Sequence, residues 1–383
     1  MRIAVIGGGP AGLFFARLMM MQNPEHEIDL FEQNPRNATY GFGVVFTERA
    51  LWPVLQADKE LYDAIVAASE RQEHITVHHR NTPVRVVGNV YFGIARAALL
   101  EVMQEHCEQV GVRIHFESRI EGVKDLADYD LVVGADGINS AVRGEFAGAF
   151  GDKKEARQNY YAWYASTNLV EGLNLIFRQT DHGLFIGHTY RYADDRSGFV
   201  VECSPETLQA AGLEQMSDEE SRSYCENIFE DLLDGGHLLS NRSTWFKPEF
   251  VTCDTWFIDN VVLIGDALNT AHPSIGSGTR FGMQDAIALA AAFEERDGDV
   301  SGALELFVKM RRRKSDALQL VAMRSIIWYE TVEEKLGLSP VDFAFSFMMR
   351  TGRVDYERLR EMDREYVRAY ETAPSELLAE IAK

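Results

Sequence analysis

The feature that most constrains the fold is a glycine pattern at the start of the chain, in RIAVIGGGPAGLFFARLMM (residues 2–20). The apolar run from Ile3 to Ile6 predicts a buried strand. Gly7, Gly9 and Gly12 then form GxGxxG ahead of an apolar helix. Such glycines permit a tight turn, close approach of a pyrophosphate and close packing of helix on strand, and the helix N-terminus attracts phosphates. The pattern therefore predicts a dinucleotide-binding unit.

A second strand strengthens this prediction. EIDLFEQ (27–33) ends in Glu32, 20 residues beyond Gly12. A carboxylate at this position accepts hydrogen bonds from a ribose diol and disfavours a 2′-phosphorylated nucleotide. The alternative interpretation is that the glycines only turn a loop.

Two more apolar strands end in an acid beside a glycine. YDLVVGADGINSAVR (129–143) contains Asp136-Gly137, and NVVLIGDALNTAHPSIGSGTR (260–280) contains Gly265-Asp266 followed by a glycine-rich loop into a helix. A plain NAD dehydrogenase is not expected to have these additional acid-tipped strands.

These three motifs, in this order, resemble the class A flavoprotein monooxygenases of the para-hydroxybenzoate hydroxylase group. The resemblance implies FAD as the cofactor, with Asp266 accepting from a ribityl hydroxyl and the loop N–H groups facing the flavin pyrimidine. The cofactor-binding residues it implies are Gly7, Gly9, Ala11, Gly12, Leu13, Glu32, Gln33, Arg96, Asp136, Asp266, Gly276, Gly278 and Thr279.

The glycine loop also supplies the catalytic candidates His272, Pro273 and Arg280. His272 is the first candidate for proton handling or substrate contact. The family commonly has His at position 269 and Asn at position 280, whereas this chain has Asn269 and Arg280. Three roles are open for Arg280: favouring anionic reduced flavin, contacting substrate, or capping the loop.

The fold class implied is mixed α/β: a Rossmann-like FAD-binding domain, an inserted antiparallel-sheet substrate domain and a C-terminal helical segment. The alternating, aromatic segments NYYAWYASTNL and SGFVVECS favour that sheet. We expect the FAD domain at 1–75, 93–155 and 250–295, the substrate domain at 76–92 and 156–249, and the helices at 296–383.

Composition excludes several classes of function. The formal net charge of −21 argues against a nucleic-acid or anionic-membrane surface. The four cysteines have no CxxC pair, and no His/Cys/carboxylate cluster has metal-ligand spacing, so we expect reduced thiols and no metal. Because the sequence enters a strand at once, we expect no signal peptide, and no apolar run is long enough to predict a membrane span. A cytoplasmic monomer or homodimer is expected.

The resemblance also implies a reaction. NADH or NADPH, bound transiently because no second GxGxxG unit exists, reduces FAD; O₂ then forms a flavin C4a-hydroperoxide that hydroxylates an electron-rich ring. The strings YGFGVVFTERAL and WYETVEEKLGLSPVDFAFSFMMRTGRVDYERLREMD are similar to those of aryl-CoA hydroxylases typified by salicylyl-CoA 5-hydroxylase. This similarity implies a CoA thioester substrate: salicylyl-CoA, hydroxylated at its 5-position to gentisyl-CoA, or a related hydroxybenzoyl- or aminobenzoyl-CoA. The same strings also resemble the monooxygenase half of 2-aminobenzoyl-CoA monooxygenase/reductase. We expect no second, reductase module here, which favours hydroxylation without ring reduction.

Two other functions remain open. The violacein-pathway tryptophan hydroxylase shares parts of the same strings, so an indole-type substrate is an alternative. A non-catalytic flavin redox sensor is the alternative from another class, whereas the WxWxIP signature of flavin halogenases is absent.

The substrate-site candidates are less constrained. The candidates lining the site are Phe42, Gly43, Val44, Trp163, Tyr164, His188 and Tyr190. For the phosphates of CoA, we consider Arg191, Arg196 and the run Arg311–Arg313; the alternative for this run is a solvated helix face.

Overall fold

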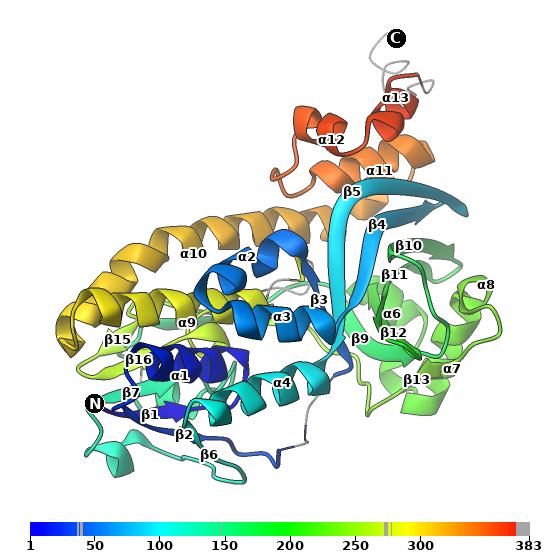
Figure 1. The fold of residues 1–383 in the computed structure, drawn as a ribbon. Coiled ribbons are helices and arrows are strands. Elements are labelled where there is room, and N and C mark those ends of the chain that lie inside the picture. The colour runs from blue at the N-terminus through cyan, green and yellow to red at the C-terminus, as the bar shows by residue number, and fades with distance from the viewer. Residues whose placement is uncertain (37, 39–40, 147, 272–274, 277, 373–383) are drawn as a thin grey trace.

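Two large β-sheets lie side by side, and a long helix extends from one to the other (Figure 1). The structure is a computed structural model that describes residues 1–36, 38, 41–146, 148–271, 275–276 and 278–372. The predicted catalytic residues His272 and Pro273 lie outside the described residues.

The first sheet carries the nucleotide motifs. Its six strands have the order β15-β16-β7-β1-β2-β6 and are parallel except for the β15–β16 pair. Ile6 pairs with Gly134 and Gly134 with Leu263, so β1, β7 and β16 end at the same level. The strands are β1 (Arg2–Ile6), β2 (Glu27–Phe31), β6 (Arg113–His115), β7 (Leu131–Gly134), β15 (Phe257–Ile258) and β16 (Val261–Leu263).

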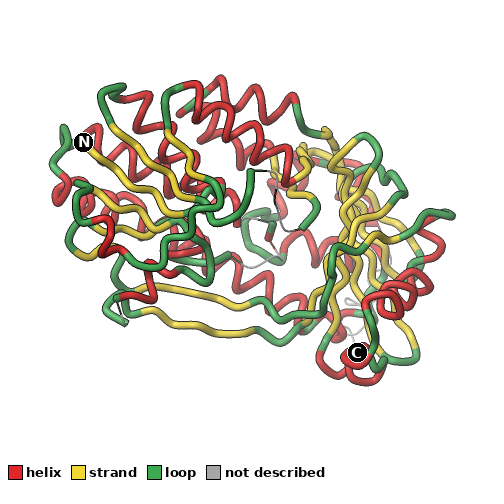
Figure 2. The backbone as a smooth tube through the Cα atoms, turned by 90° about the horizontal axis from the view of Figure 1, so that it is seen from below, coloured by secondary structure: helices red, strands yellow, loops and turns green. Residues whose placement is uncertain are grey.

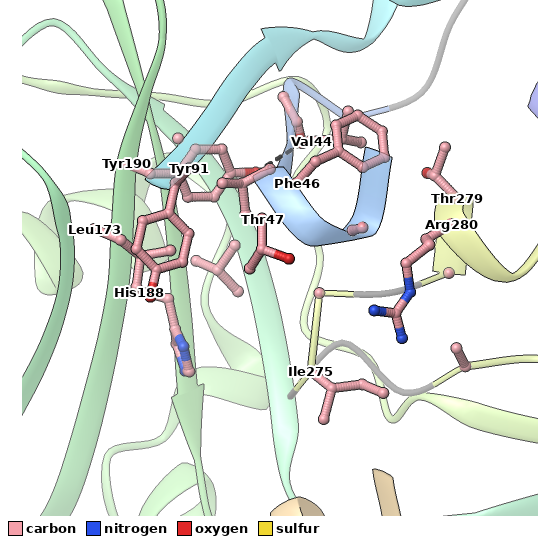
Figure 3. Close-up of a pocket in the computed structure, with 18 of the residues that line it drawn as sticks. Val44, Phe46, Thr47, Tyr91, Leu173, His188, Tyr190, Ile275, Thr279 and Arg280 are labelled. Carbon is pink, nitrogen blue, oxygen red and sulfur yellow. Dashed lines mark hydrogen bonds between the residues drawn. The ribbon is translucent and has the colours of Figure 1, made fainter. Parts of the chain in front are cut away.

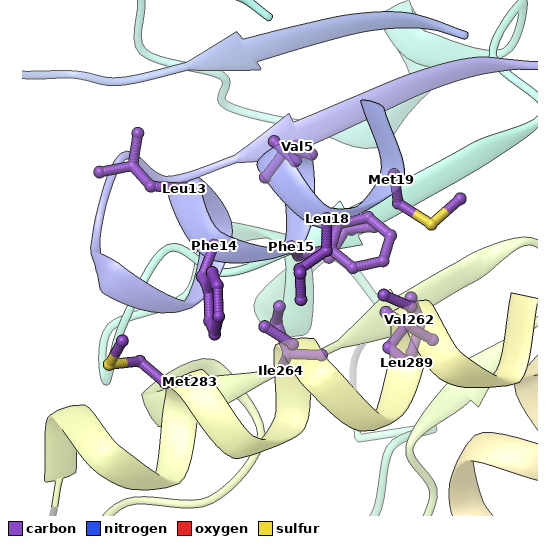
Figure 4. Close-up of a cluster of buried hydrophobic side chains, with 14 of the residues drawn as sticks. Val5, Leu13, Phe14, Phe15, Leu18, Met19, Val262, Ile264, Met283 and Leu289 are labelled. Atoms are coloured by element: carbon purple, nitrogen blue, oxygen red, sulfur yellow. The ribbon is translucent and has the colours of Figure 1, made fainter. Parts of the chain in front are cut away.

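Helices α1 (Pro10–Gln22), α4 (Arg96–Gln109) and α9 (Gly278–Glu295) lie over this sheet. Figure 4 shows Phe14 of α1 above Ile264 and Met283, so that α1, the end of β16 and α9 share one core. Phe14 and Ile264 are fully buried. Burying a side chain of this size stabilises the fold by about 1.5–3 kcal/mol. This packing fixes the start of α1 against the start of α9.

The second sheet has eight strands in the order β13-β9-β12-β11-β10-β4-β5-β3. The predicted antiparallel sheet is present, with one exception, because β10 pairs with β4 in parallel. The chain returns to the first sheet between β5 and β9, so β10 does not follow β4 through a hairpin. The strands are β3 (Gly43–Thr47), β4 (Glu70–His79), β5 (Thr82–Ala95), β9 (Tyr160–Ser166), β10 (Leu173–Thr180), β11 (Gly183–Ala193), β12 (Arg196–Cys203) and β13 (Leu238–Leu239).

The eight-stranded sheet is covered differently on its two faces. Phe185 and Phe199 pack behind it in one core cluster with Cys225 and Phe229. The opposite face is shared between the cavity described below and the C-terminal helices. The short helices behind the sheet are α6 (Pro205–Ala210), α7 (Asp218–Ile228) and α8 (Glu230–Leu233).

Helix α10 (Val300–Glu330) joins the two halves of the molecule. At about 1.5 Å per residue, it extends over roughly 45 Å. Its first part packs Phe307 in the core of the first sheet, and its last part packs Trp328 and Tyr329 against the second. Beyond it lie α11 (Pro340–Met349), α12 (Tyr356–Met362) and α13 (Arg364–Thr372).

A two-stranded ribbon, β8 (Asp152–Ala156) with β14 (Glu249–Cys253), forms a second connection between the halves (Figure 2). The remaining elements are α2 (Glu48–Ala57), α3 (Lys59–Ala67), α5 (Ala141–Glu145) and the 3₁₀ turns η1 (Val123–Leu126), η2 (Leu213–Gln215), η3 (Gly265–Ala267) and η5 (Val332–Lys335).

The predicted fold class is confirmed: a mixed α/β fold with a nucleotide-binding sheet, a second, largely antiparallel sheet and C-terminal helices. Strands β3, most of β4 and the end of β5 fall within the ranges assigned to the FAD domain but belong to the second sheet, so the division into domains stays a proposal. In the described part of the chain, no helix combines the length and apolarity needed to cross a membrane.

Candidate active site

Gly7 and Gly12 shape the turn between β1 and α1. Gly7 has a φ of +109°, and a Cβ atom there would lie 2.3 Å from the carbonyl oxygen of Ala135. A Cβ on Gly12 would lie 2.2 Å from the carbonyl oxygen of Gly7. A side chain at either position would push α1 away from the sheet. At Gly9, in contrast, an added Cβ would have no atom within 4 Å, so open space remains before the N-terminus of α1.

Glu32 follows β2 and faces the same turn. Its Oε2 accepts the N–H of Gly8 at 2.7 Å, and its Oε1 accepts the N–H of Asn34 at 2.8 Å. Oε1 also accepts the side-chain amide of Asn34 at 2.7 Å. A carboxylate offers about four acceptor positions, so Glu32 retains one for a ribose hydroxyl. The neighbouring Gln33 is exposed.

Asp136 follows β7 and organises the middle motif. Its Oδ2 accepts the N–H groups of Ala141 at 2.7 Å and Val142 at 3.2 Å, while Oδ1 is buried with no partner among the described residues. Burial raises the pKa of this carboxyl. Arg143 donates to the carbonyl oxygen of Ala267 at 2.7 Å, which ties the middle motif to η3.

Asp266 and Arg96 come from distant segments of the chain and lie near one another on the wall of one cavity. Asp266 is open to this cavity but enclosed by protein elsewhere, and this burial raises its pKa to about 6; Arg96 opposes the shift and Asp285 adds to it. Asp285 also accepts the N–H of Gly265 at 3.1 Å and so holds the backbone beside Asp266.

We expect Asp266 to stabilise the FAD-free protein more at low pH. Because the folded-state pKa of about 6 exceeds the value near 3.9 of an unfolded aspartate, the folded state binds the proton more tightly. The free energy of unfolding from this group therefore rises as the pH falls from 7 towards 4. In thermal unfolding of FAD-free protein, the Tm gain of Asp266→Asn over the natural chain should be larger at pH 7 than at pH 5. An equal gain at both pH values would contradict this prediction.

The cavity has a volume of about 1200 Å³ and runs from the edge of the first sheet to the face of the second. Figure 3 shows Tyr190, His188 and Leu173 on one side of it, and Ile275, Thr279 and Arg280 on the other. The predicted residues that line it are Gly9, Ala11, Phe42, Gly43, Val44, Arg96, Trp163, Tyr164, His188, Tyr190, Asp266, Gly276, Gly278, Thr279 and Arg280.

Several predicted site residues make contacts with protein groups outside the cavity. Leu13 is fully buried in the core of the first sheet, where Figure 4 shows it on α1. Tyr164 borders the cavity, but its hydroxyl lies 3.2 Å from Oγ of Ser221 in the packing behind the sheet. Trp163, one residue earlier on β9, is 37% exposed and meets Phe246 edge to face. Because successive residues of a strand face opposite sides, only one of these two side chains can reach substrate.

On the wall formed by the second sheet, His188 is bound to a buried acid that the sequence analysis did not identify. His188 Nε2 lies 3.0 Å from Oε2 of Glu202, and Glu202 is fully buried. Burial raises the pKa of Glu202, but hydrogen bonds with His188, Asn159 and Tyr161 outweigh it, so the pKa lies below its usual value. Glu202 therefore stays ionised beside His188. The signal in the sequence was an acid at an inward position of the apolar strand FVVEC.

Three of the arginines considered for CoA phosphates pair with acids. Arg191 pairs with Glu70 at 3.1 Å, and Arg196 with Asp195 at 2.8 Å. Arg311 is 3% exposed, and its Nε donates to Oδ1 of buried Asp285 at 2.6 Å. Neither interpretation of the run 311–313 holds for Arg311, because its guanidinium is turned inward to neutralise a buried carboxylate.

The described residues fit FAD. The first motif leaves room at Gly9 for a pyrophosphate, the carboxylate of Glu32 faces the same turn, and Asp266 and the start of α9 line the cavity. Buried Oδ1 of Asp136 is an acceptor with no described partner. Together these features define a flavin-nucleotide site of the Rossmann type.

Comparisons with known proteins agree. The model of the FAD binding domain family matches residues 1–299, so the chain belongs to this family. Salicyloyl-CoA 5-hydroxylase of a Streptomyces species is 36% identical, over 92% of this chain and 70% of that protein. Protodeoxyviolaceinate monooxygenase of Chromobacterium violaceum is also 36% identical, over 91% of this chain and 94% of that protein. A 3-hydroxy-4-methyl-anthranilyl-(aryl-carrier protein) 5-monooxygenase of Streptosporangium sibiricum is 34% identical, over 86% and 89%.

Solved structures share the fold. The tetrameric form of 2-methyl-3-hydroxypyridine-5-carboxylic acid oxygenase superposes with a TM-score of 0.70 at 17% identity, covering 96% of this chain and 97% of that chain. A probable FAD-dependent monooxygenase from Pseudomonas aeruginosa superposes with a TM-score of 0.69 at 19% identity, covering 91% and 100%. With the sequence relatives, these findings confirm the predicted resemblance: the protein is an FAD-dependent monooxygenase of the aromatic hydroxylase type.

Proposed function

We propose that the protein hydroxylates an aromatic ring carried as a CoA thioester, such as salicylyl-CoA at its 5-position, with NAD(P)H as electron donor and O₂ as oxidant. The observation that carries the proposal is one continuous cavity that joins the FAD-binding edge to the His188–Glu202 pair. Its volume of about 1200 Å³ exceeds the roughly 300–1000 Å³ of most single-ligand pockets, which leaves room for an aromatic substrate beside the cofactor.

Bound FAD supplies the redox chemistry, activating O₂ so that one oxygen atom is transferred to the ring. The protein's part is to bind and orient. Backbone N–H groups at the start of α9 would face the flavin pyrimidine and stabilise negative charge there. We propose that Trp163 and Tyr190 form the aromatic wall against which the substrate ring packs.

His188 is our proposed proton acceptor. With Nε2–H donating to Glu202, the remaining lone pair is on Nδ1, and the side chain lines the cavity. Removing the proton from a substrate hydroxyl or amino group at this position would make the ring more electron-rich, which favours attack on oxygen. Glu202 would stabilise the imidazolium formed. The earlier candidate for this role, His272, stays a prediction.

The proposal is tested by oxidation of NADH and NADPH with the FAD-loaded protein, comparing salicylyl-CoA with free salicylate. We expect oxidation that the thioester stimulates more strongly, with a product one oxygen heavier by mass. Stimulation by salicylate alone would contradict the thioester assignment. Absence of stimulation by either compound would contradict the assignment of a salicylyl substrate.

A second candidate substrate class is an indole. It is favoured by the 36% identity with protodeoxyviolaceinate monooxygenase, of whose length the chain covers 94%. Tryptophan and indolic acids therefore belong in the same assay. Turnover of an indole without turnover of salicylyl-CoA would favour this candidate.

A further inference from the structure

The charged residues of the cavity wall are mostly arginines, although the whole chain has a net charge of −21. The acids that line the cavity are Glu48, Asp266 and Glu361, and the basic residues are Arg49, Arg96, Arg280, Arg350, Arg353 and Arg358. A locally basic cavity in an acidic protein attracts anions.

Three of these arginines have roles inside the protein. Arg96 is close to Asp266. Arg350 donates to Oγ of Ser325 at 3.1 Å and lies 3.8 Å from the centroid of the Phe347 ring. The guanidinium of Arg49 lies over the Trp52 ring. These side chains are therefore held by protein groups.

Arg280, Arg353 and Arg358 have no hydrogen bond or ion pair from their guanidinium groups in the described part of the chain. Arg353 is exposed, and Arg280 has only a ring contact, with its guanidinium 6.0 Å from the centroid of Phe281. Nε and Nη2 of Arg280 and Nε of Arg358 are buried and have no hydrogen-bond partner among the described residues. The only cavity acid near Arg358 in sequence, Glu361, forms no ion pair with these three arginines in the described part of the chain. Buried donors without acceptors destabilise the fold, and the cost is greater when they are charged.

Their mutual repulsion adds to this cost. Burial, together with the positive charges of Arg353 and Arg311, lowers the pKa of Arg280 to about 10. Burial also lowers the pKa of Arg353. Figure 3 shows the guanidinium of Arg280 extending from the start of α9 into the space that Ile275 also faces. A bound anion would satisfy the donors and relieve the repulsion together.

We propose that Arg280, Arg353 and Arg358 form an oxyanion-binding subsite that holds the phosphate groups of the substrate's CoA moiety. The identity of its ligand rests on the proposed function, in which the substrate is an aryl-CoA. Arg353 lies between α11 and α12, and Arg358 lies on α12, whose Met362 packs on Gly88 of β5. The thioester would thus extend from the aromatic wall towards the C-terminal helices. A carboxylate of a free aromatic acid presents the same chemistry and is the competing source of the anion.

Binding to the FAD-loaded protein tests the subsite without turnover. Calorimetric titrations with CoA, inorganic pyrophosphate and salicylate should be compared for the natural chain, Arg353→Met and Arg358→Met. Loss of a charge-assisted hydrogen bond, worth about 1.5–3 kcal/mol, should raise the Kd for CoA and pyrophosphate by about 10- to 150-fold. Arg313→Met, an exposed position outside the cavity lining, is the matched control and should leave each Kd unchanged.

The outcomes of these titrations support or overturn the subsite. Weaker binding of CoA and pyrophosphate alone supports the phosphate assignment, whereas weaker binding of salicylate alone overturns it in favour of a carboxylate site. An unchanged Kd for all three probes overturns the subsite itself. The flavin absorbance and Tm of each variant report whether FAD and the fold are retained. If binding depends on the arginines but no aryl-CoA is hydroxylated, the proposed function fails and the subsite stands.

Discussion

Replacing His188 by glutamine should lower kcat for hydroxylation by about 10²–10⁴-fold, the range typical of a lost general base. Glutamine keeps a polar side chain of similar size beside Glu202 but cannot accept a proton near neutral pH. The hydroxyl or amino group of a phenol or aniline substrate would then keep its proton. The ring would therefore be less electron-rich and would react slowly with the activated oxygen. The measurement is product formation per unit time at saturating substrate.

Two comparisons separate this role from a structural one. The reduction of FAD by NAD(P)H and the FAD content should be unchanged in His188→Gln, because neither depends on the substrate's proton. His182→Ala is the matched control, since His182 is exposed in the turn between β10 and β11, outside the cavity lining. An unchanged kcat in His188→Gln, or an equal loss in His182→Ala, would remove His188 from the mechanism.

Replacing Arg311 by methionine should reduce the free energy of unfolding by about 3–5 kcal/mol. Asp285 is 3% exposed, and Arg311 is its only ion-pair partner in the described part of the chain, at 2.6 Å. Removing one member of a buried pair leaves the other charge uncompensated, which costs this amount. Asp285 also accepts the N–H of Gly265, so we expect weaker FAD retention as well. Chemical denaturation and flavin release by gel filtration measure the two effects.

Arg313→Met is the matched control in the same helix. Arg313 is exposed, and substitutions at such positions usually change stability by less than about 0.5 kcal/mol. Equal stability of Arg311→Met and Arg313→Met would mean that the Asp285–Arg311 pair contributes no net stability.

Local sequence patterns predicted the nucleotide-binding half of the molecule well. Gly7 and Gly12 allow no side chain for steric reasons that depend on a few neighbouring atoms, and Glu32 follows its strand directly. Such features repeat wherever a strand, a tight turn and a helix meet at a pyrophosphate. The cofactor followed from three motifs whose strands end at one edge of the sheet.

The rest of the site depends on contacts between distant segments. The role of Glu202 could not be predicted from the sequence, because it depends on the pairing of β12 with β11, which brings Glu202 to His188. Arg353 and Arg280 are 73 positions apart in the sequence, and no periodicity relates them. Arg311 looked like part of a solvated basic face because its partner Asp285 lies on another helix. The parallel pairing of β10 with β4 was missed for the same reason.

The most direct test of aromatic hydroxylation is the source of the oxygen in the product. FAD-loaded protein should be given NAD(P)H and salicylyl-CoA under isotopically labelled O₂, and the product analysed by mass. The proposed function predicts a hydroxylated thioester that carries one labelled oxygen atom. Consumption of NAD(P)H with release of hydrogen peroxide and no labelled product, from this thioester or from an indole, would contradict an aromatic hydroxylase.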